Sequence, residues 1–181
     1  LLERVQLVEL DRQVVEVCKR FFPELTAGFS DPRVRLEFMD GMRFVGQAGD
    51  SFDVVIVDST DPVGYGEHLF TDRFFTGVFS RLNETGMFVI QTESLHFHRE
   101  FVIDVQIRLR KLFQIVDLYC IPLATYPGNW WTFSIASRGY PVSKQRRKQE
   151  VETRYYDAET HRKSFLPRSA YRKLLDGTLD W

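Results

Sequence analysis

Hydrophobic residues follow two different spacings along the chain, and each spacing predicts one kind of element. Short apolar runs rich in β-branched residues predict strands at 5–10, 34–39, 52–57, 87–90, 115–119 and 131–136. Apolar residues three or four positions apart predict helices at 12–22, 74–82 and 99–112, a helical turn after Asp40 and a short helix at 171–175. Because strands alternate with helices of about ten residues, the pattern predicts an α/β fold with a doubly wound sheet.

The strand predicted at 52–57 is apolar at nearly every position. Such a run is typical of a strand that is buried on both faces of a parallel sheet. The last two predicted strands differ from the others, because no helical pattern separates them. We therefore expect a mostly parallel sheet with an antiparallel end strand, formed where these two strands pair.

Composition and charge limit the possible partners. Hydrophobic residues make up 44% of the 181 positions and charged residues 27%, as in an ordinary soluble globular protein. A net charge of −1 predicts no bulk attraction to nucleic acid or to a membrane surface, and no apolar stretch approaches the roughly 20 residues of a membrane span. Cys18 and Cys120 lie in apolar patterns typical of reduced core residues, which favours a cytoplasmic protein.

Two carboxylates stand directly after the strand at 52–57, in the segment Asp58–Pro62. Ligands of α/β sheets bind in the crevice outside the carboxyl ends of the strands. One acid there could be a helix cap, whereas Asp58 and Asp61, three residues apart, suggest a cationic substrate. The alternative for Asp61 is that it caps the turn before Pro62.

Two earlier strands also end in acids, Glu9 and Asp40. In a nucleotide-binding α/β fold, an acid at the end of the second strand accepts hydrogen bonds from both ribose hydroxyls. Glu9 has this position if a preceding segment supplies the first strand and its glycine-rich turn. Asp40 could accept from an adenine amine, with Gly41 leaving room for the ring. The alternatives are that Glu9 is a solvated strand-end acid beside a capping Asp11, and that Asp40–Gly41 is a plain turn.

Five short motifs occur in a fixed order along the chain. They are Val8–Asp11, Asp40–Gly41, Asp58–Gly64, Gln91–Ser94 and Thr125–Pro127. Their order and spacing resemble those of the spermidine synthase family of polyamine aminopropyltransferases. The tail from Tyr155 to Pro167 also resembles the C-terminal segment of this family, so the resemblance covers nearly the whole chain.

The resemblance implies a Rossmann-like fold of the class I methyltransferase type. Residues 1–138 would form the partial catalytic core, and residues 139–181 a linker and a helical tail that packs on it. The family's N-terminal β-stranded domain and glycine-rich loop would precede Leu1, so the chain is expected to be an N-terminally truncated fragment. The missing first strand would lie between the strands that end at Glu9 and Asp58, and its absence would leave an unpaired sheet edge.

The resemblance also implies the reaction. Decarboxylated S-adenosylmethionine, a co-substrate rather than a prosthetic group, would donate an aminopropyl group to putrescine, giving spermidine and methylthioadenosine. The sulfonium is already a good leaving group, so no metal is expected. The partners would be polyamine and nucleoside substrates, without nucleic acid or membrane, and the complete protein would be a homodimer or homotetramer.

Site roles follow from the same resemblance. Asp58 would be the general base, since deprotonating an alkylammonium with a pKa of about 10 costs roughly 4 kcal/mol at pH 7. Asp61 would anchor the amine, Gln91 would accept a hydrogen bond from it, and Tyr126 would offer a hydroxyl and a ring face. The nucleoside would contact Glu9, Asp40, Gly41, Ser59 and Tyr65, where Tyr65 replaces the proline common in the family.

Several alternatives stay open at this point. Gln91 could satisfy backbone groups only, and Tyr126 could be a packing residue. His96 and His98 alternate as metal ligands can, but no third ligand is evident. The chain could instead be a methyltransferase that uses S-adenosylmethionine, or a non-catalytic regulatory homologue. Agmatine, cadaverine or spermidine could replace putrescine as the acceptor.

Overall fold

The computed structural model describes residues 2–126, 130–145 and 151–180. The chain divides into two compact units, residues 1–49 and residues 50–181. Each unit is described by itself.

The first unit contains a two-stranded parallel sheet with short helices. Its elements are β1 (Val5–Glu9), α1 (Arg12–Phe21), α2 (Pro23–Thr26), the 3-10 helix η1 (Ala27–Ser30), β2 (Val34–Phe38) and α3 (Gly41–Gly46). The strands pair in register from Val5 opposite Val34 to Glu9 opposite Phe38. Pro23 occupies the first turn of α2, where a missing N–H costs nothing. The helix predicted at 12–22 is confirmed as α1.

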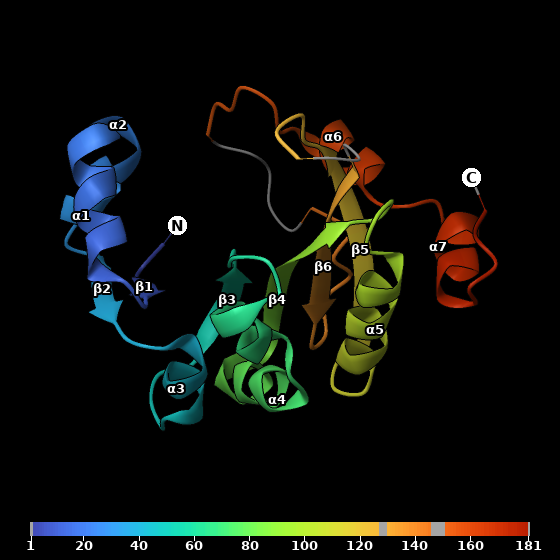
Figure 1. Cartoon of the computed structure of the whole chain (residues 1–181), viewed down its shortest axis with the longest axis horizontal. Helices are drawn as coiled ribbons and strands as arrows, with labels where there is room; N and C mark the ends of the chain where they lie inside the picture. Colours follow the sequence, from blue (N-terminus) through green and yellow to red (C-terminus); the bar gives the residue numbers. More distant parts are fainter. Residues whose placement is uncertain (1, 127–129, 146–150, 181) are drawn as a thin grey trace. The chain divides into compact units, whose positions relative to one another are not determined.

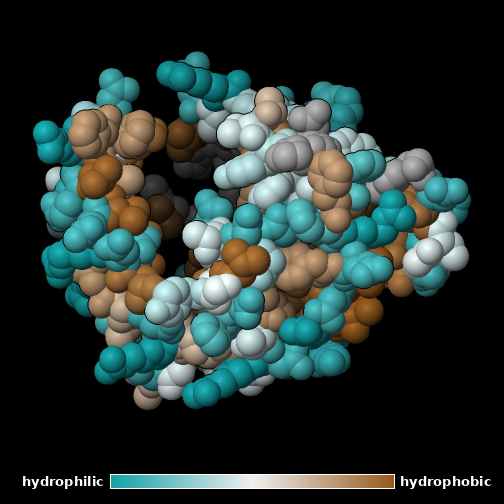
Figure 2. Space-filling view, in the orientation of Figure 1, coloured by the Kyte–Doolittle hydropathy of each residue, from teal (hydrophilic) through white to brown (hydrophobic). Residues whose placement is uncertain are grey.

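The apolar stripe predicted on α1 is mostly uncovered within this unit. Val15 is buried, whereas Val14, Phe21 and Phe22 are exposed. Figure 2 shows brown apolar side chains among the teal ones on this part of the chain, where Figure 1 draws α1 and α2. A two-stranded sheet is too small to cover a helix face, so among the described residues this unit does not close a core.

The second unit is built on a four-stranded mixed sheet in the order β3-β4-β6-β5 (Figure 1). Its elements are β3 (Phe52–Val57), the 3-10 helix η2 (Gly64–Phe70), α4 (Asp72–Arg81), β4 (Leu82–Ser94), α5 (Arg99–Arg110), β5 (Ile115–Pro122), β6 (Trp130–Ser137), α6 (Ala158–Ser164) and α7 (Arg168–Leu175). β3 and β4 are parallel, and β6 is antiparallel to both β4 and β5. The α/β class and the antiparallel pairing of the last two strands are thus confirmed.

The position of the antiparallel strand differs from the prediction. β6 lies between β4 and β5, so the end strand of the sheet is β5, which runs in the direction of β4. The described strands form two separate sheets, and a single doubly wound sheet therefore stays a prediction. β4 is also longer than expected at both ends, because residues 82–86 precede the predicted strand and the polar residues Gln91–Ser94 continue it.

The prediction that β3 is buried on both faces is wrong for the described part of the chain. Val54 is 45% exposed and Ile56 is 70% exposed. Within the described strands β3 pairs with β4 only, so its other edge is open. Apolar side chains of β3 are therefore exposed to solvent within this unit.

The core of the second unit lies between the sheet and its helices. Thr71 caps α4 by accepting a hydrogen bond from the Phe74 amide at 3.2 Å, and the predicted stripe of this helix is buried. Phe75 of α4 packs on Phe88 of β4 with 6.0 Å between ring centroids. Val102, Val105 and Leu109 of α5 are buried as well.

The C-terminal helix α7 joins this core. Its fully buried Leu174 belongs to a cluster with Leu95, Val102, Leu118, Leu166, Tyr171 and Leu179. Arg168 at the start of α7 forms an ion pair with the buried Asp117 of β5 at 3.0 Å. The tail is thereby tied to α5 and β5, while a domain division at residue 138 remains a proposal.

The composition of the chain leads to expectations about the two cysteines and about membrane-spanning segments. Cys18 and Cys120 are half-buried and form no disulfide, and burial raises the pKa of the Cys120 thiol to about 12. Across the described residues, no helix is long and apolar enough to cross a bilayer.

We expect Leu174→Ala to lower the free energy of unfolding of the full-length gene product by roughly 2–4 kcal/mol, because the truncation leaves a cavity in the core. Lys173→Ala, on the exposed side of the same helix, should change it by less than about 0.5 kcal/mol. Urea unfolding followed by circular dichroism measures both. Equal losses in the two variants would contradict the placement of Leu174 in the core.

Candidate active site

The loop after β3 carries the two predicted aspartates. The side chains of Asp58 and Asp61 are both exposed. η2 folds back on this loop so closely that a Cβ added at Gly66 would lie 2.3 Å from the carbonyl oxygen of Asp61. Only glycine fits there, because any side chain would collide with the backbone of Asp61.

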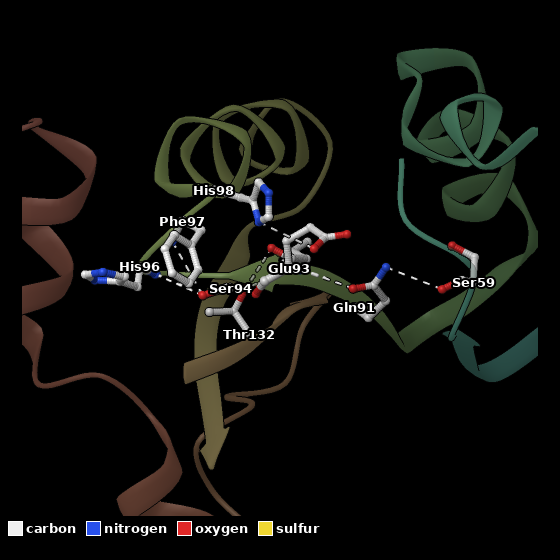
Figure 3. Close-up of polar contacts among 9 residues, drawn as sticks. Ser59, Gln91, Glu93, Ser94, His96, Phe97, His98 and Thr132 are labelled. Carbon is white, nitrogen blue, oxygen red and sulfur yellow. Dashed lines mark hydrogen bonds and ion pairs between the residues drawn. The ribbon is translucent and has the colours of Figure 1, made fainter. Parts of the chain in front are cut away.

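Gln91, near the end of β4, links this loop to the sheet. Its side chain is buried, and its Nε2 donates a hydrogen bond to the Ser59 carbonyl at 3.4 Å. Its Oε1 accepts from the Glu93 amide at 3.1 Å, and Figure 3 shows Gln91 between these two residues. Both ends of the side-chain amide thus form hydrogen bonds with backbone groups, as in the alternative that the sequence left open. A hydrogen bond between Gln91 and the substrate amine stays a prediction.

Glu93 lies on a β-bulge. Gln91 pairs with Phe133 and Ser94 pairs with Trp131, so Thr92 and Glu93 of β4 together face the single residue Thr132 of β6. Glu93 adopts a left-handed backbone conformation with φ of 69°. Bulges bend a strand and redirect a side chain, and they are frequent beside active sites.

The Glu93 carboxylate is 3% exposed and incompletely partnered. Among the described residues its Oε1 has no hydrogen-bond partner, and its Oε2 lies 3.5 Å from Nδ1 of His98 (Figure 3). Burial, and then the charge of Asp61 within hydrogen-bonding reach, raise the pKa of Glu93 to about 7. Two carboxyl groups from different elements can therefore share one proton or accept one cation.

The sequence indicated the position of Glu93 but not its role. Glu93 stands in the motif Gln91–Ser94, two residues after Gln91, and no site role was predicted for it. Its burial depends on the bulge, and a left-handed glutamate carries no local signal of the kind that glycine or asparagine gives.

A second residue without a predicted role is Tyr119 of β5. Burial, followed by the negative charge of Asp58, raises the pKa of its hydroxyl to about 12. The ring stacks on Phe133 of β6 with 5.1 Å between centroids. The phenol stays protonated at neutral pH and lies within electrostatic range of Asp58.

Tyr126 lies in the connection between β5 and β6. Its ring stacks on Trp131 with 4.4 Å between centroids, and Trp131 is paired with Ser94 of β4. Pro127, the last residue of its motif, lies outside the described residues. Tyr65, in η2, is exposed. The structure thus places Tyr126 beside β6, and its role stays a prediction.

The first unit carries the other three predicted residues. Glu9 is the last residue of β1, and Asp40 comes shortly after the end of its parallel neighbour β2. Oε1 of Glu9 accepts from the Asp11 amide at 2.9 Å. Asp40 caps α3, which starts at Gly41, by accepting from the Arg43 amide at 2.9 Å. The structure brings these carboxylates to one sheet edge, where they can accept hydrogen bonds from hydroxyl or amino groups.

The two histidines of the alternating pattern have other contacts. His98 faces Glu93, and the ring of His96 packs edge-on against Phe97 with 4.7 Å between centroids (Figure 3). In the described ranges no group of three or more His, Cys, Asp or Glu residues could hold a metal ion.

Comparisons with known proteins agree on one family. The spermine/spermidine synthase domain matches residues 1–146. Polyamine aminopropyltransferase 1 of Aquifex aeolicus (strain VF5) is 49% identical over 177 residues, which cover 98% of this chain and 63% of that protein. The polyamine aminopropyltransferase of Hydrogenobaculum sp. (strain Y04AAS1) is 43% identical over 179 residues, covering 99% of this chain and 64% of that protein.

Solved structures agree as well. Spermidine synthase in complex with the transition-state analogue AdoDATO has a TM-score of 0.86 at 32% identity, over 96% of this chain and 61% of that one. Spermidine synthase from Thermotoga maritima has a TM-score of 0.83, also at 32% identity, over 96% and 60%. The chain spans less than two-thirds of the length of these relatives.

We expect Glu93→Gln to stabilise the full-length gene product at pH 8 by roughly 2–3 kcal/mol and to change its stability little at pH 4.5. The pKa of Glu93 is raised from 4.5 to about 7, so the folded state carries no buried charge at low pH. Stability is lost as the pH rises from 4.5 through 7, and glutamine imitates the protonated form.

The measurement is urea unfolding at a series of pH values and constant protein concentration. Glu84→Gln is the control, since Glu84 is exposed near the other end of β4. The same change in unfolding free energy at both pH values would rule out the raised pKa.

Proposed function

Because the chain belongs to the spermine/spermidine synthase family, we propose that the protein carrying it is a polyamine aminopropyltransferase. The observation that carries the proposal is the group of carboxylates Asp58, Asp61 and Glu93 around the ends of β3 and β4. A polyamine is a multiply charged cation, and an incompletely partnered buried carboxylate beside a second acid favours such a ligand.

The proposed donor is decarboxylated S-adenosylmethionine and the proposed acceptor is putrescine. The amine nitrogen attacks the methylene carbon next to the sulfonium, and the carbon–sulfur bond breaks with its electron pair going to sulfur. The amine proton passes to a base. The products are spermidine and methylthioadenosine, and the sulfonium leaves as a neutral thioether without help from a metal or a prosthetic group.

Asp58 is the proposed base. It stands first after β3, and its exposed carboxylate is free of the packing that holds Glu93. A carboxylate at hydrogen-bonding distance can take the proton and orient the nitrogen lone pair. Asp61 and Glu93 would then hold the other, still charged ammonium, with Gln91 and Tyr126 completing the amine site.

The residues proposed to contact the nucleoside end of the donor are those that the family resemblance indicates. Glu9 would bind the ribose hydroxyls and Asp40 the adenine amine beside Gly41, with Ser59 and Tyr65 as further contacts. Support comes from the parallel pairing of β1 and β2, which places both acids at one edge. The likeness to a spermidine synthase that binds the analogue AdoDATO supports a Rossmann-like core of the class I methyltransferase type.

The assembly and location of the protein are proposed from its family. We expect a homodimer or homotetramer in the cytoplasm, acting on small polyamine and nucleoside substrates. A methyltransferase would need no site for a dication, and the retained Asp58 and Asp61 argue against a purely regulatory homologue.

The direct test is an aminopropyl-transfer assay on the full-length gene product, analysed by mass spectrometry. It supplies decarboxylated S-adenosylmethionine with putrescine, cadaverine, agmatine or spermidine. Spermidine formed from putrescine is the expected result. Methyl transfer from S-adenosylmethionine, or no transfer by folded protein that binds methylthioadenosine, would overturn the proposal.

We expect Asp58→Asn to reduce turnover at least about a hundredfold while leaving methylthioadenosine binding unchanged, because asparagine cannot accept the amine proton. The matched control is Asp53→Asn at the start of the same strand, where Asp53 accepts a hydrogen bond from Asn83 at 2.8 Å. Turnover numbers and calorimetric titration with methylthioadenosine measure the two effects. Near-normal turnover of the Asp58 variant would remove it as the base.

A further inference from the structure

Thr132 holds the bulge that carries Glu93. Its hydroxyl lies within hydrogen-bonding distance of two successive carbonyls, Thr92 O at 3.0 Å and Glu93 O at 2.9 Å. Figure 3 shows Thr132 directly below this turn of the chain. A left-handed backbone is unfavourable for a residue with a Cβ, and Thr132 binds the carbonyl of that residue.

Behind Thr132 a chain of polar side chains runs through the core to the C-terminal helix α7. Three hydroxyl groups come first: Thr132 Oγ1 lies 2.8 Å from Thr92 Oγ1, which lies 3.2 Å from Ser134 Oγ. The side-chain amide of Gln106 comes next, with its Nε2 2.7 Å from Ser134 Oγ and its Oε1 bonded to the Tyr171 hydroxyl. That hydroxyl lies 2.7 Å from Arg110. The side chains from Thr132 to Tyr171 are all buried. The links therefore form without competition from bulk water.

The direction of every hydrogen bond in this chain follows from its two ends. Arg110 can only donate, and a backbone carbonyl can only accept. Tyr171 accepts from Arg110 and donates to the amide oxygen of Gln106, whose amide nitrogen donates to Ser134. Each following hydroxyl then donates to the next, and the last donates to the bulge. Removing one hydroxyl takes one hydrogen-bond partner away from a buried neighbour.

We propose that Thr132, and the buried chain from Tyr171 through Gln106, Ser134 and Thr92, are positioning residues that aim the Glu93 carboxylate at Asp61. This inference rests on the proposed function for its effect on amine binding. In a regular strand, Gln91 and Glu93 would point to the same face two residues apart. The bulge instead lets Gln91 accept from the Glu93 amide and places Glu93 beside the aspartate loop.

The decisive comparison is Thr132→Val against Thr132→Ser in the full-length gene product. Valine keeps the shape of threonine and loses the hydroxyl, whereas serine keeps the hydroxyl. Thr132→Val should raise the KM for putrescine about tenfold, the effect of one lost hydrogen bond, while the Kd for methylthioadenosine stays within about twofold. Thr132→Ser should stay within about threefold of the wild type in both.

A second pair tests the far end of the chain. Tyr171→Phe removes the hydroxyl that donates to Gln106 and should shift the putrescine KM in the same direction. Leu174→Ala weakens the packing of the same helix but keeps every hydroxyl of the chain, and it should lower stability without changing that KM. This pair also serves if Thr132→Val does not fold.

Crystal structures of the wild type and of a folded hydroxyl-deficient variant supply a readout that does not need activity. Positioning predicts that φ of Glu93 leaves the left-handed region when the hydroxyl is lost. An unchanged Glu93 with an unchanged putrescine KM would overturn the inference, as would equal rises in putrescine KM and methylthioadenosine Kd. If the wild type transfers no aminopropyl group but Glu93 still moves in the variant, the proposed function falls and the positioning role stands.

Discussion

The arrangement of the candidate site depends on the buried Glu93 carboxylate, one oxygen of which has no hydrogen-bond partner within the described part of the chain. Taking the charge of Glu93 out of water is costly, and placing Asp61 beside it raises the cost further. The folded protein can relieve the pair by binding one proton or one cation. The proposed diamine substrate would meet this need, because one ammonium would stay charged against the pair while the other would lose its proton at the proposed base, Asp58.

Ordinary packing builds the scaffold for this arrangement. The parallel pairing of β3 and β4 brings the loop after β3 next to the end of β4, and Gln91 fastens one to the other. Gly66 lets η2 lie against the Asp61 carbonyl. The two acids of the pair thus come from two segments, the loop after β3 and the end of β4, that contacts of their own hold together.

Local patterns predicted most elements and part of the site. The helical stripe of α4, the helix α1 and the acids at the ends of β1, β2 and β3 follow from spacing and side-chain chemistry alone. The place of β6 between β4 and β5 could not be predicted, since strand order depends on contacts far apart in sequence. A site role for Glu93 could not be predicted for the same reason, because its bulge is formed with Thr132, about forty residues away in the chain. The exposure of β3 could not be predicted either, because it depends on which other segments pack against this strand in the described structure and not on its own residues.

The polar chain behind Glu93 has no advantage for stability alone. Valine or alanine at Thr92, Thr132 and Ser134 would fill nearly the same space without burying hydroxyls, and apolar replacements of buried polar groups are often neutral or stabilising. An apolar side chain at 132, however, cannot bind two carbonyls at once, and a left-handed glutamate needs that support. A hydroxyl at 132 needs a donor to its own oxygen in turn, and the same requirement passes from Thr92 to Ser134, Gln106 and Tyr171. The conformation of one site residue thus accounts for a row of polar side chains that ends in the C-terminal helix.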